Sequence, residues 1–239
     1  MQKGKANGNG KASSLLPDTW QEWLYPLFPD TYTGGIATYH EDFWDWLWAI
    51  HSHGNPHTTS SANPQPFVAV WPRGWAKSTN GEIATSALGA MDFKYALYVS
   101  SRQQQADDHV QTIAQRLESD AVARMHPDLA SPQLGRFGNQ RAWRRSRVMT
   151  AGGFTVDAIG LDAAIRGTKI EDARPDIIIL DDVDEENDSQ ETIAKKIRAI
   201  TTKILPAAAP FVVVLVLQNL VHRNGIVAQL VDGRADFLA

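Results

Sequence analysis

The chain has 239 residues, of which 43% are hydrophobic and 21% are charged, and its formal net charge is −4. This composition is that of a globular protein with a substantial core, which excludes a disordered or fibrous chain. The sequence contains no cysteine, which excludes disulfides and thiolate metal sites. Its negative net charge requires any contact with nucleic acid to come from a local patch.

The amino-terminal residues 1–14 are rich in Gly, Lys, Asn and Ser and have no apolar periodicity. They predict a flexible tail in front of one folded domain over residues 15–239. The longest apolar run, residues 211–217, has the length of a strand and is too short to cross a membrane. Together with an amino terminus unlike a signal sequence, this predicts a soluble intracellular protein without membrane contact.

Residues 39–50 place aromatic and aliphatic side chains mostly on one helical face: Phe43, Trp44, Leu47, Trp48 and Ile50. Such a stripe predicts a core helix, with adenine stacking by one of the rings as the alternative. Residues 51–66 predict a loop. Its three histidines have no carboxylate or cysteine at ligand spacing, so we expect no metal site there.

A short apolar stretch, residues 68–70, leads into a turn and then into Lys77 and Ser78. In a phosphate-binding loop the backbone N–H groups of the turn hold an anion, the lysine reaches the β- and γ-phosphates, and the serine ligates Mg²⁺. The usual glycines are replaced here by Trp71 and Ala76, so an ordinary turn with a solvated lysine stays the alternative. The expected nucleotide contacts are Arg73, Gly74, Trp75, Ala76, Lys77, Ser78 and Thr79.

Helical patterning over residues 79–91 is followed by a strand-like run at 95–99 and a second helical stretch at 104–124. This alternation predicts an α/β fold with a mostly parallel central sheet and helices on both faces. Residues 148–150 and 154–160, joined through a Gly-Gly turn, predict an inserted β-hairpin.

The segment before that hairpin concentrates arginine around two aromatic residues. Its five arginines are Arg136, Arg141, Arg144, Arg145 and Arg147. Arginine binds phosphate and aromatic rings stack on bases, which fits a loop that grips a nucleic-acid backbone. A solvated hairpin arm explains the same pattern equally well.

A second motif follows residues 177–180, an uninterrupted apolar run that predicts a strand buried on both faces of a parallel sheet. Asp181 and Asp182 come directly after it, at the edge where such sheets bind ligands. We expect Asp181 to hold the Mg²⁺ that Ser78 also contacts, and Asp182 to orient the attacking water. The later acidic residues, Glu185, Glu186 and Asp188, predict a solvated loop.

The remaining elements are a helix that Ser189 caps and that ends at Pro206, a buried strand at residues 211–217 and a final helix at 226–231.

The order and spacing of four motifs resemble the ATPase domain of a bacteriophage large terminase subunit. The motifs are the phosphate loop, Ser100-Ser101-Arg102, Ile165-Arg166-Gly167 before residues 174–182, and residues 217–223. The resemblance covers about residues 35–235. It implies a doubly wound P-loop NTPase that uses ATP and Mg²⁺ to drive double-stranded DNA into a preformed capsid.

The resemblance also implies partners and a location. The partners would be double-stranded DNA, the portal protein, the small terminase subunit and further copies of this chain in a homo-oligomeric ring. The location would be the host cytoplasm, outside the mature virion. The chain shows no later strand with spaced carboxylates after residue 231, so we expect no nuclease activity from it.

Site residues follow from the resemblance position by position. Arg73 falls at the arginine of the family's variant loop, Lys77 and Ser78 at its phosphate and Mg²⁺ contacts, and Asp181 at its metal-binding aspartate. Asp182 stands where the family often has a catalytic glutamate. Its shorter side chain retracts the carboxylate by about one C–C bond, so either the water is held differently or Glu185 reaches in.

Three further residues take roles from the resemblance. Arg166 matches the arginine that projects into a neighbouring subunit's site, with a salt bridge at a hairpin end as the alternative. Gln218 and Asn219 match the motif that senses the γ-phosphate and couples hydrolysis to movement, where the family more often has small residues.

Two other functions stay open at this point. One is a helicase-like DNA translocase. The other is a nucleotide- or DNA-binding assembly module that does not hydrolyse, which the departures at Trp71, Ala76 and Asp182 keep open.

Overall fold

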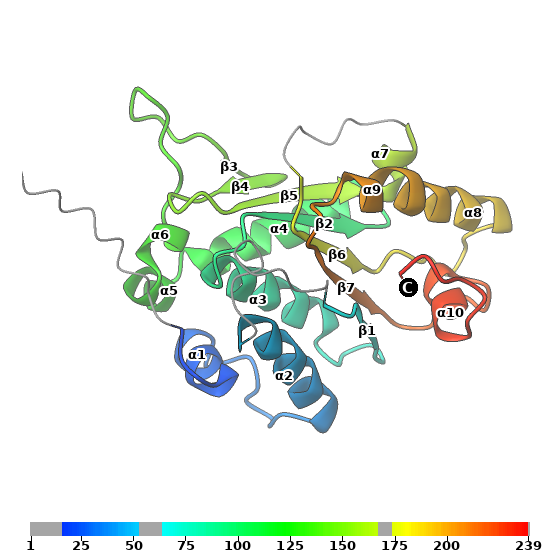
Figure 1. Ribbon diagram of the computed structural model, residues 1–239, viewed down its shortest axis with the longest axis horizontal. Helices are drawn as coiled ribbons and strands as arrows, with labels where there is room; N and C mark the ends of the chain where they lie inside the picture. Colours follow the sequence, from blue (N-terminus) through cyan, green and yellow to red (C-terminus); the bar gives the residue numbers. More distant parts are fainter. Residues whose placement is uncertain (1–15, 53–63, 167–173, 239) are drawn as a thin grey trace, which may run out of the picture.

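A computed structural model describes residues 16–52, 64–166 and 174–238. The predicted tail at residues 1–14 and most of the predicted loop at 51–66 lie outside the described residues. The described chain forms an α/β fold around one seven-stranded sheet (Figure 1). Its strands are Phe67–Val70 (β1), Tyr95–Ser100 (β2), Trp143–Arg144 (β3), Arg147–Met149 (β4), Thr155–Gly160 (β5), Ile177–Asp181 (β6) and Val213–Gln218 (β7).

The sheet is mostly parallel, as the sequence predicts. Its strand order is β1-β7-β6-β2-β5-β4-β3; the pairs from β1 to β5 are parallel, and β5·β4 and β4·β3 are antiparallel. The predicted hairpin is confirmed, since Met149 of β4 pairs with Thr155 of β5. β5 also pairs in parallel with β2, so the hairpin extends one edge of the main sheet.

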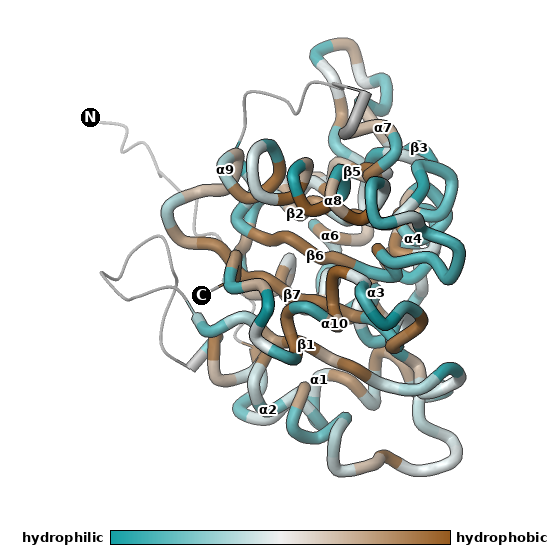
Figure 2. Tube along the Cα trace, turned by 90° about the vertical axis from the view of Figure 1, so that its right-hand side faces the viewer, coloured by the Kyte–Doolittle hydropathy of each residue, from teal (hydrophilic) through white to brown (hydrophobic). Residues whose placement is uncertain are grey.

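Helices cover both faces of the sheet. They are Trp20–Leu27 (α1), Thr38–Ser52 (α2), Lys77–Ala90 (α3), Gln103–Leu117 (α4), Asp120–Met125 (α5), Pro127–Ala130 (α6), Leu161–Arg166 (α7), Gln190–Ala199 (α8), Leu205–Ala207 (α9) and Ile226–Val231 (α10), with a π-helix, Ile200–Ile204, between α8 and α9. Side chains from α1 to α6 build one core and those from α7, α8, the π-helix and α10 build the other. Figure 2 shows the central strands as a hydrophobic layer within the molecule.

Strand β6 is buried on both faces, which confirms the interpretation of its apolar run. Ile177 and Ile179 belong to the first core, whereas Ile178 and Leu180 belong to the second. The parallel registers pair Val70 with Gln218 and Asp181 with Leu217. The carboxyl ends of β1, β6 and β7 therefore lie together at one edge of the sheet.

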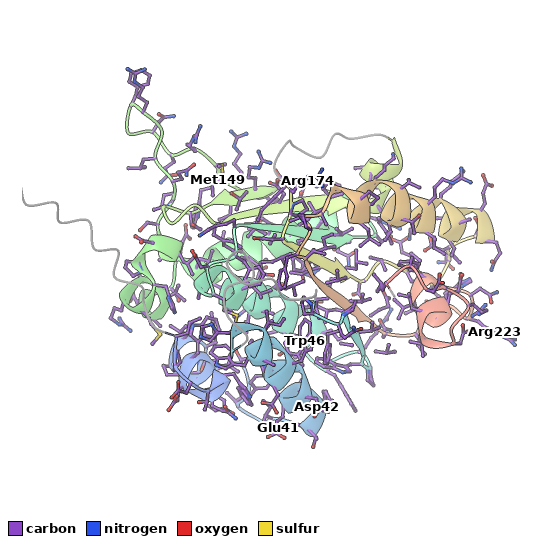
Figure 3. The ribbon with its side chains drawn as sticks, viewed as in Figure 1. Glu41, Asp42, Trp46, Met149, Arg174 and Arg223 are labelled. Carbon is purple, nitrogen blue, oxygen red and sulfur yellow. The ribbon has the colours of Figure 1, made fainter. Side chains whose placement is uncertain are left out.

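Helix α2 confirms the core interpretation of the aromatic stripe, since Phe43, Trp44, Leu47, Trp48 and Ile50 are all buried. Figure 3 shows Glu41 and Asp42 on the outward side of this helix. The ring of Trp46 packs 5.1 Å from that of Phe67, so it contacts the start of β1.

The predicted helices differ from the observed ones at two places. The single helix predicted at residues 104–124 is wrong, because Ser119 accepts a hydrogen bond from Val122 N and begins a separate helix, α5. Helix α1 was not predicted at all. The helix after Ser189 is confirmed, with the Ser189 hydroxyl 3.1 Å from Thr192 N, but the helical segment continues through the π-helix to Ala207.

Within the described residues, no helix is long and apolar enough to cross a membrane.

Candidate functional site

A cleft of about 710 Å³ opens at the carboxyl ends of β1, β6 and β7. It is lined by Arg73, Gly74, Ala76, Lys77, Ser78, Thr79, Gln105, Asp182, Asp184, Glu185, Glu186, Gln218, Asn219 and Val221. Residues far apart in the chain, chosen from sequence motifs, thus share one cleft. Of the predicted nucleotide contacts only Trp75 is missing from its wall.

The loop between β1 and α3 turns sharply into the cleft. Ala76 has φ 55° and Gly74 has φ 79°, both in the left-handed region. Asn80 N donates to Ala76 O at 2.9 Å, which starts α3 at Lys77. The first turn of α3 lines the cleft, and its backbone N–H groups have no acceptor within the helix. Ala76 adopts here a conformation that glycine adopts without strain.

Lys77 is the first residue of α3, and its side chain is largely buried against the loop. Its Nζ donates to Pro72 O at 3.0 Å. A neutral carbonyl compensates an ammonium charge only in part, so this lysine is suited to bind an anion in the cleft.

Helix α2 contacts Trp75 from outside the loop. Its ring, 43% exposed, stacks on Tyr39 at 4.6 Å, and its carbonyl lies 3.1 Å from His40 Nε2. Trp75 therefore supports the loop from the rim and does not line the cleft.

Asp181 ends β6 and lies fully buried under the cleft. Its Oδ2 accepts a hydrogen bond from the Tyr98 hydroxyl at 2.7 Å and lies 3.6 Å from His109 Nε2. Its Oδ1 accepts no hydrogen bond from any described residue. Burial raises the pKa of Asp181 to about 6, although His109, Tyr98 and the Ser78 hydroxyl oppose that shift.

A second layer of polar residues supports Asp181 from below. His109 Nδ1, on α4, lies 3.0 Å from Glu82 Oε1, on α3, and Arg116 lies 3.1 Å from Glu82 Oε2. Burial lowers the pKa of His109, but the bond to Glu82 and the charges of Asp181 and Glu82 outweigh it, so the net shift is upward. These contacts join α3, α4 and β6.

Sequence analysis missed this layer. The available signal was the shared face of α4 that His109 and Arg116 occupy, seven residues apart on an amphipathic helix. Which acid they meet depends on how α3 and α4 pack, and no local pattern gives that.

The backbone of Asp182, the next residue, has an uncommon conformation. Its φ is 48°, its N–H donates to Leu217 O at 3.0 Å, and its carbonyl accepts from Ser101 N at 3.3 Å. Its Oδ1 is buried without a hydrogen-bond partner among the described residues. This left-handed conformation is uncommon for a residue other than glycine, although aspartate adopts it more readily than most.

The donors at this edge fit Mg²⁺. The Ser78 hydroxyl contacts Asp181, and Asp181 and Asp182 each have a buried oxygen without a hydrogen-bond partner among the described residues. Hard oxygen ligands of this kind are those that Mg²⁺ prefers. The described residues contain no group of three or more His, Cys, Asp or Glu able to hold a metal ion. Magnesium would therefore need phosphate oxygens and water to complete its coordination.

Glu185 lines the cleft but is already paired. Arg102 donates to its two oxygens at 2.7 and 2.9 Å, and this contact lowers the pKa of Glu185. The prediction of a solvated loop is confirmed for the exposed Glu186 and is wrong for Asp188, which lies 2.6 Å from the buried Lys196 Nζ.

Asp184 was not predicted as a site residue, and its contacts are structural. Its oxygens accept from Ile226 N at 2.7 Å and Val227 N at 3.0 Å, which caps helix α10. A Cβ on Gly225 would lie 2.6 Å from Asp184 Oδ2, so this approach needs glycine.

Gln218 joins three segments of the cleft wall. Its carbonyl accepts from Trp71 N at 3.2 Å, and its side-chain oxygen accepts from Asp184 N at 3.2 Å. The end of β7 is therefore tied to the loop after β1 and to the segment after β6. Asn219 follows on the cleft wall.

Arg166 is the last residue of α7, and its side chain lies outside the described part of the structure.

Comparison with known proteins adds no assignment: no protein-family model matches the chain, and no curated protein matches it.

Proposed function

We propose that this chain is a P-loop NTPase that hydrolyses ATP with Mg²⁺ at the cleft between β1, β6 and β7. The observation that supports the proposal is the shared cleft, in which Lys77 and Ser78 line the same wall as Asp182, with Asp181 buried directly before it in the chain. Each of the two aspartates has a buried oxygen without a hydrogen-bond partner among the described residues. A nucleoside triphosphate would supply the negative charge that balances Lys77 and the N–H groups of the loop. Its phosphate oxygens would also supply the further ligands that magnesium needs.

In this mechanism the loop and Lys77 bind the β- and γ-phosphates. The free N–H groups at the start of α3 and the ammonium both favour an anion at that place. Ser78 and Asp181 would hold the magnesium ion, which neutralises phosphate charge when it is bound.

Asp182 would orient the water that attacks the γ-phosphorus. The water oxygen forms a bond to the γ-phosphorus, and the bond from that phosphorus to the β–γ bridging oxygen breaks. ADP leaves with the bridging oxygen on its β-phosphate, and the proton of the water passes to the inorganic phosphate that is released. Asp182 is favoured for this role over Glu185, because Glu185 would have to give up its ion pair with Arg102. Arg166 of a neighbouring subunit would neutralise charge as the phosphoryl group leaves.

We further propose that hydrolysis powers the packaging of double-stranded viral DNA into a procapsid. This part rests on the resemblance of the four motifs to the large terminase subunit. It implies a homo-oligomeric ring of copies on the portal protein, with the small terminase subunit as a further partner. Gln218 would transmit the loss of the γ-phosphate, since its two hydrogen bonds join the phosphate loop to the segment after Asp182.

A steady-state ATPase assay tests the proposal. We expect turnover that requires Mg²⁺, rises with duplex DNA and increases per subunit with protein concentration, because sites between subunits form only on assembly. Lys77→Ala should abolish hydrolysis. Near-normal turnover of this variant would rule out the phosphate-loop role, and wild-type binding without turnover would identify a non-hydrolysing module. Separation of strands on forked DNA would identify a helicase.

A further inference from the structure

A basic arm projects from the opposite edge of the sheet. We define it as residues 131–147, from the end of α6 to the first residue of β4, which has five arginines and no acidic residue. Figure 1 shows its loop extending away from the body beyond α6 and β3. β3 and β4 end the sheet at the side opposite β1, so the arm is separate from the cleft.

The arm is an ordered extension of the sheet. Gln133 N donates to Met149 O at 2.8 Å, and Arg141 N donates to Gln133 O at 2.8 Å. An antiparallel bridge joins Leu134 to Gln140, and Gly135 N donates to Asn139 O at 2.7 Å. These bonds close a tight turn and hold its tip at a fixed place.

The tip of the arm carries an aromatic residue with no packing role. Phe137 is 90% exposed and Leu134 is 60% exposed. Gly138, with φ 79°, completes the turn that presents Phe137 outward. Burial of this ring would have to come from a partner, because the fold provides none.

The five arginines separate into two groups. Arg147 pairs with Asp157 and Arg145 pairs with Asp108, so these two fasten the base of the arm. Arg136, Arg141 and Arg144 are exposed, and within the described residues they form no ion pair. Three guanidinium groups thus lie along one exposed arm of a chain whose net charge is negative.

We infer that this arm grips a nucleic-acid backbone, with Arg136, Arg141 and Arg144 on phosphates and Phe137 stacked on a base where a strand is unpaired. Guanidinium groups bind phosphate through paired hydrogen bonds, and an exposed ring stacks on any unpaired base without regard to sequence. This deepens the proposed function, since it names the surface of the chain that would hold DNA.

The test measures binding without nucleotide, by fluorescence anisotropy of a labelled duplex and of the matching single strand over a range of salt concentrations. For R136A/R141A/R144A we expect the slope of log K against log salt on duplex to fall by about 2–3, since each phosphate contact contributes about 0.9. Phe137→Ala should weaken binding to the single strand about 5- to 100-fold, and Phe137→Leu should weaken it similarly because leucine does not stack.

The matched control is K195A/R198A/R223A, which removes the same charge from exposed positions on α8 and before α10. The inference that the arm binds nucleic acid is supported if the arm variant loses slope while this control keeps the wild-type slope. It is contradicted if the arm variant keeps that slope, if both variants lose it equally, or if the wild-type chain binds neither probe. A change confined to self-association would show a protein contact instead and would also overturn the inference.

ATP hydrolysis without DNA, measured on the same samples, keeps the two proposals apart. The arm variants should hydrolyse ATP at the wild-type rate, because the arm lies at the other edge of the sheet from the cleft. Loss of DNA binding with normal hydrolysis supports the inference that the arm binds nucleic acid. Absence of hydrolysis in the wild-type chain contradicts the proposed function alone and leaves the binding result valid.

Discussion

At the scale of single residues, the surroundings of the Asp181 carboxylate disfavour its ionised form. It is fully buried, one of its oxygens has no partner among the described residues, and burial raises its pKa from 3.8 to about 6. A raised pKa for an acid means that the folded protein holds the proton more tightly than the unfolded chain. Ionised Asp181 therefore destabilises the protein without nucleotide, and this cost grows as the pH rises from about 3.9 through about 6.

We predict that Asp181→Asn stabilises the nucleotide-free protein at pH 7.5 by about 1–3 kcal/mol while it abolishes ATP hydrolysis. Urea unfolding at pH 7.5 and near pH 4 provides the measurement. The difference between variant and wild type should shrink at the lower pH, where Asp181 is protonated. A variant less stable than wild type at both pH values would contradict the assignment of a buried charge that its neighbours compensate only in part.

Ala76 provides a second test at this scale. Its φ of 55° disfavours any residue with a Cβ, so Ala76→Gly should stabilise the protein by up to about 1 kcal/mol and leave nucleotide binding intact. Ala194→Gly on the exposed face of α8 is the matched control and should cost about 1 kcal/mol, since its backbone is helical. Equal losses from both substitutions would mean that the loop is not held in the left-handed conformation.

At the scale of secondary-structure elements, His109 connects α3, α4 and β6 through Glu82 and Asp181. His109→Phe keeps a ring beside Tyr98, which lies 5.0 Å from the His109 ring, but removes both polar contacts. We expect a loss of about 1–3 kcal/mol in unfolding free energy at pH 7.5. In an Asp181→Asn background the loss should be smaller, and strict additivity in this double-mutant cycle would argue against the connection.

The helices and strands show which parts of the fold can be predicted from patterns in the sequence. Strands β2, β6 and β7 were found because residues buried on both faces leave a continuous apolar run. The break between α4 and α5 was missed because one cap, Ser119, interrupts a pattern that is otherwise helical on both sides. The aspartates after β6 were found from their place at a strand end.

The support of those aspartates was not predictable in the same way. Tyr98, His109 and Glu82 belong to three elements and meet Asp181 only through packing. The pairing of Glu185 with Arg102 also joins residues 83 positions apart. Long-range contacts of this kind leave no periodic or local mark in one sequence.

At the scale of the whole molecule, the proposed mechanism requires sites that form between copies of the chain. Helix α7, which ends at Arg166, follows β5, whereas the cleft lies at β6, β7 and β1, on the other side of β2. We predict that Arg166→Ala binds ATP normally but does not hydrolyse it when assembled. Mixing it with inactive Lys77→Ala subunits should restore part of the activity, because each variant supplies the residue that the other lacks. Mixed assemblies that stay inactive would exclude action between subunits.

The most direct test of the central claim is electron paramagnetic resonance of Mn²⁺, used in place of Mg²⁺, bound with a slowly hydrolysed ATP analogue. We expect one tightly bound ion with hyperfine coupling to phosphate phosphorus. Ser78→Ala and Asp181→Asn should each weaken its binding about 10-fold or more. An ion that binds without phosphate coupling, or equally well in both variants, would contradict the meeting of loop and carboxylate around one nucleotide.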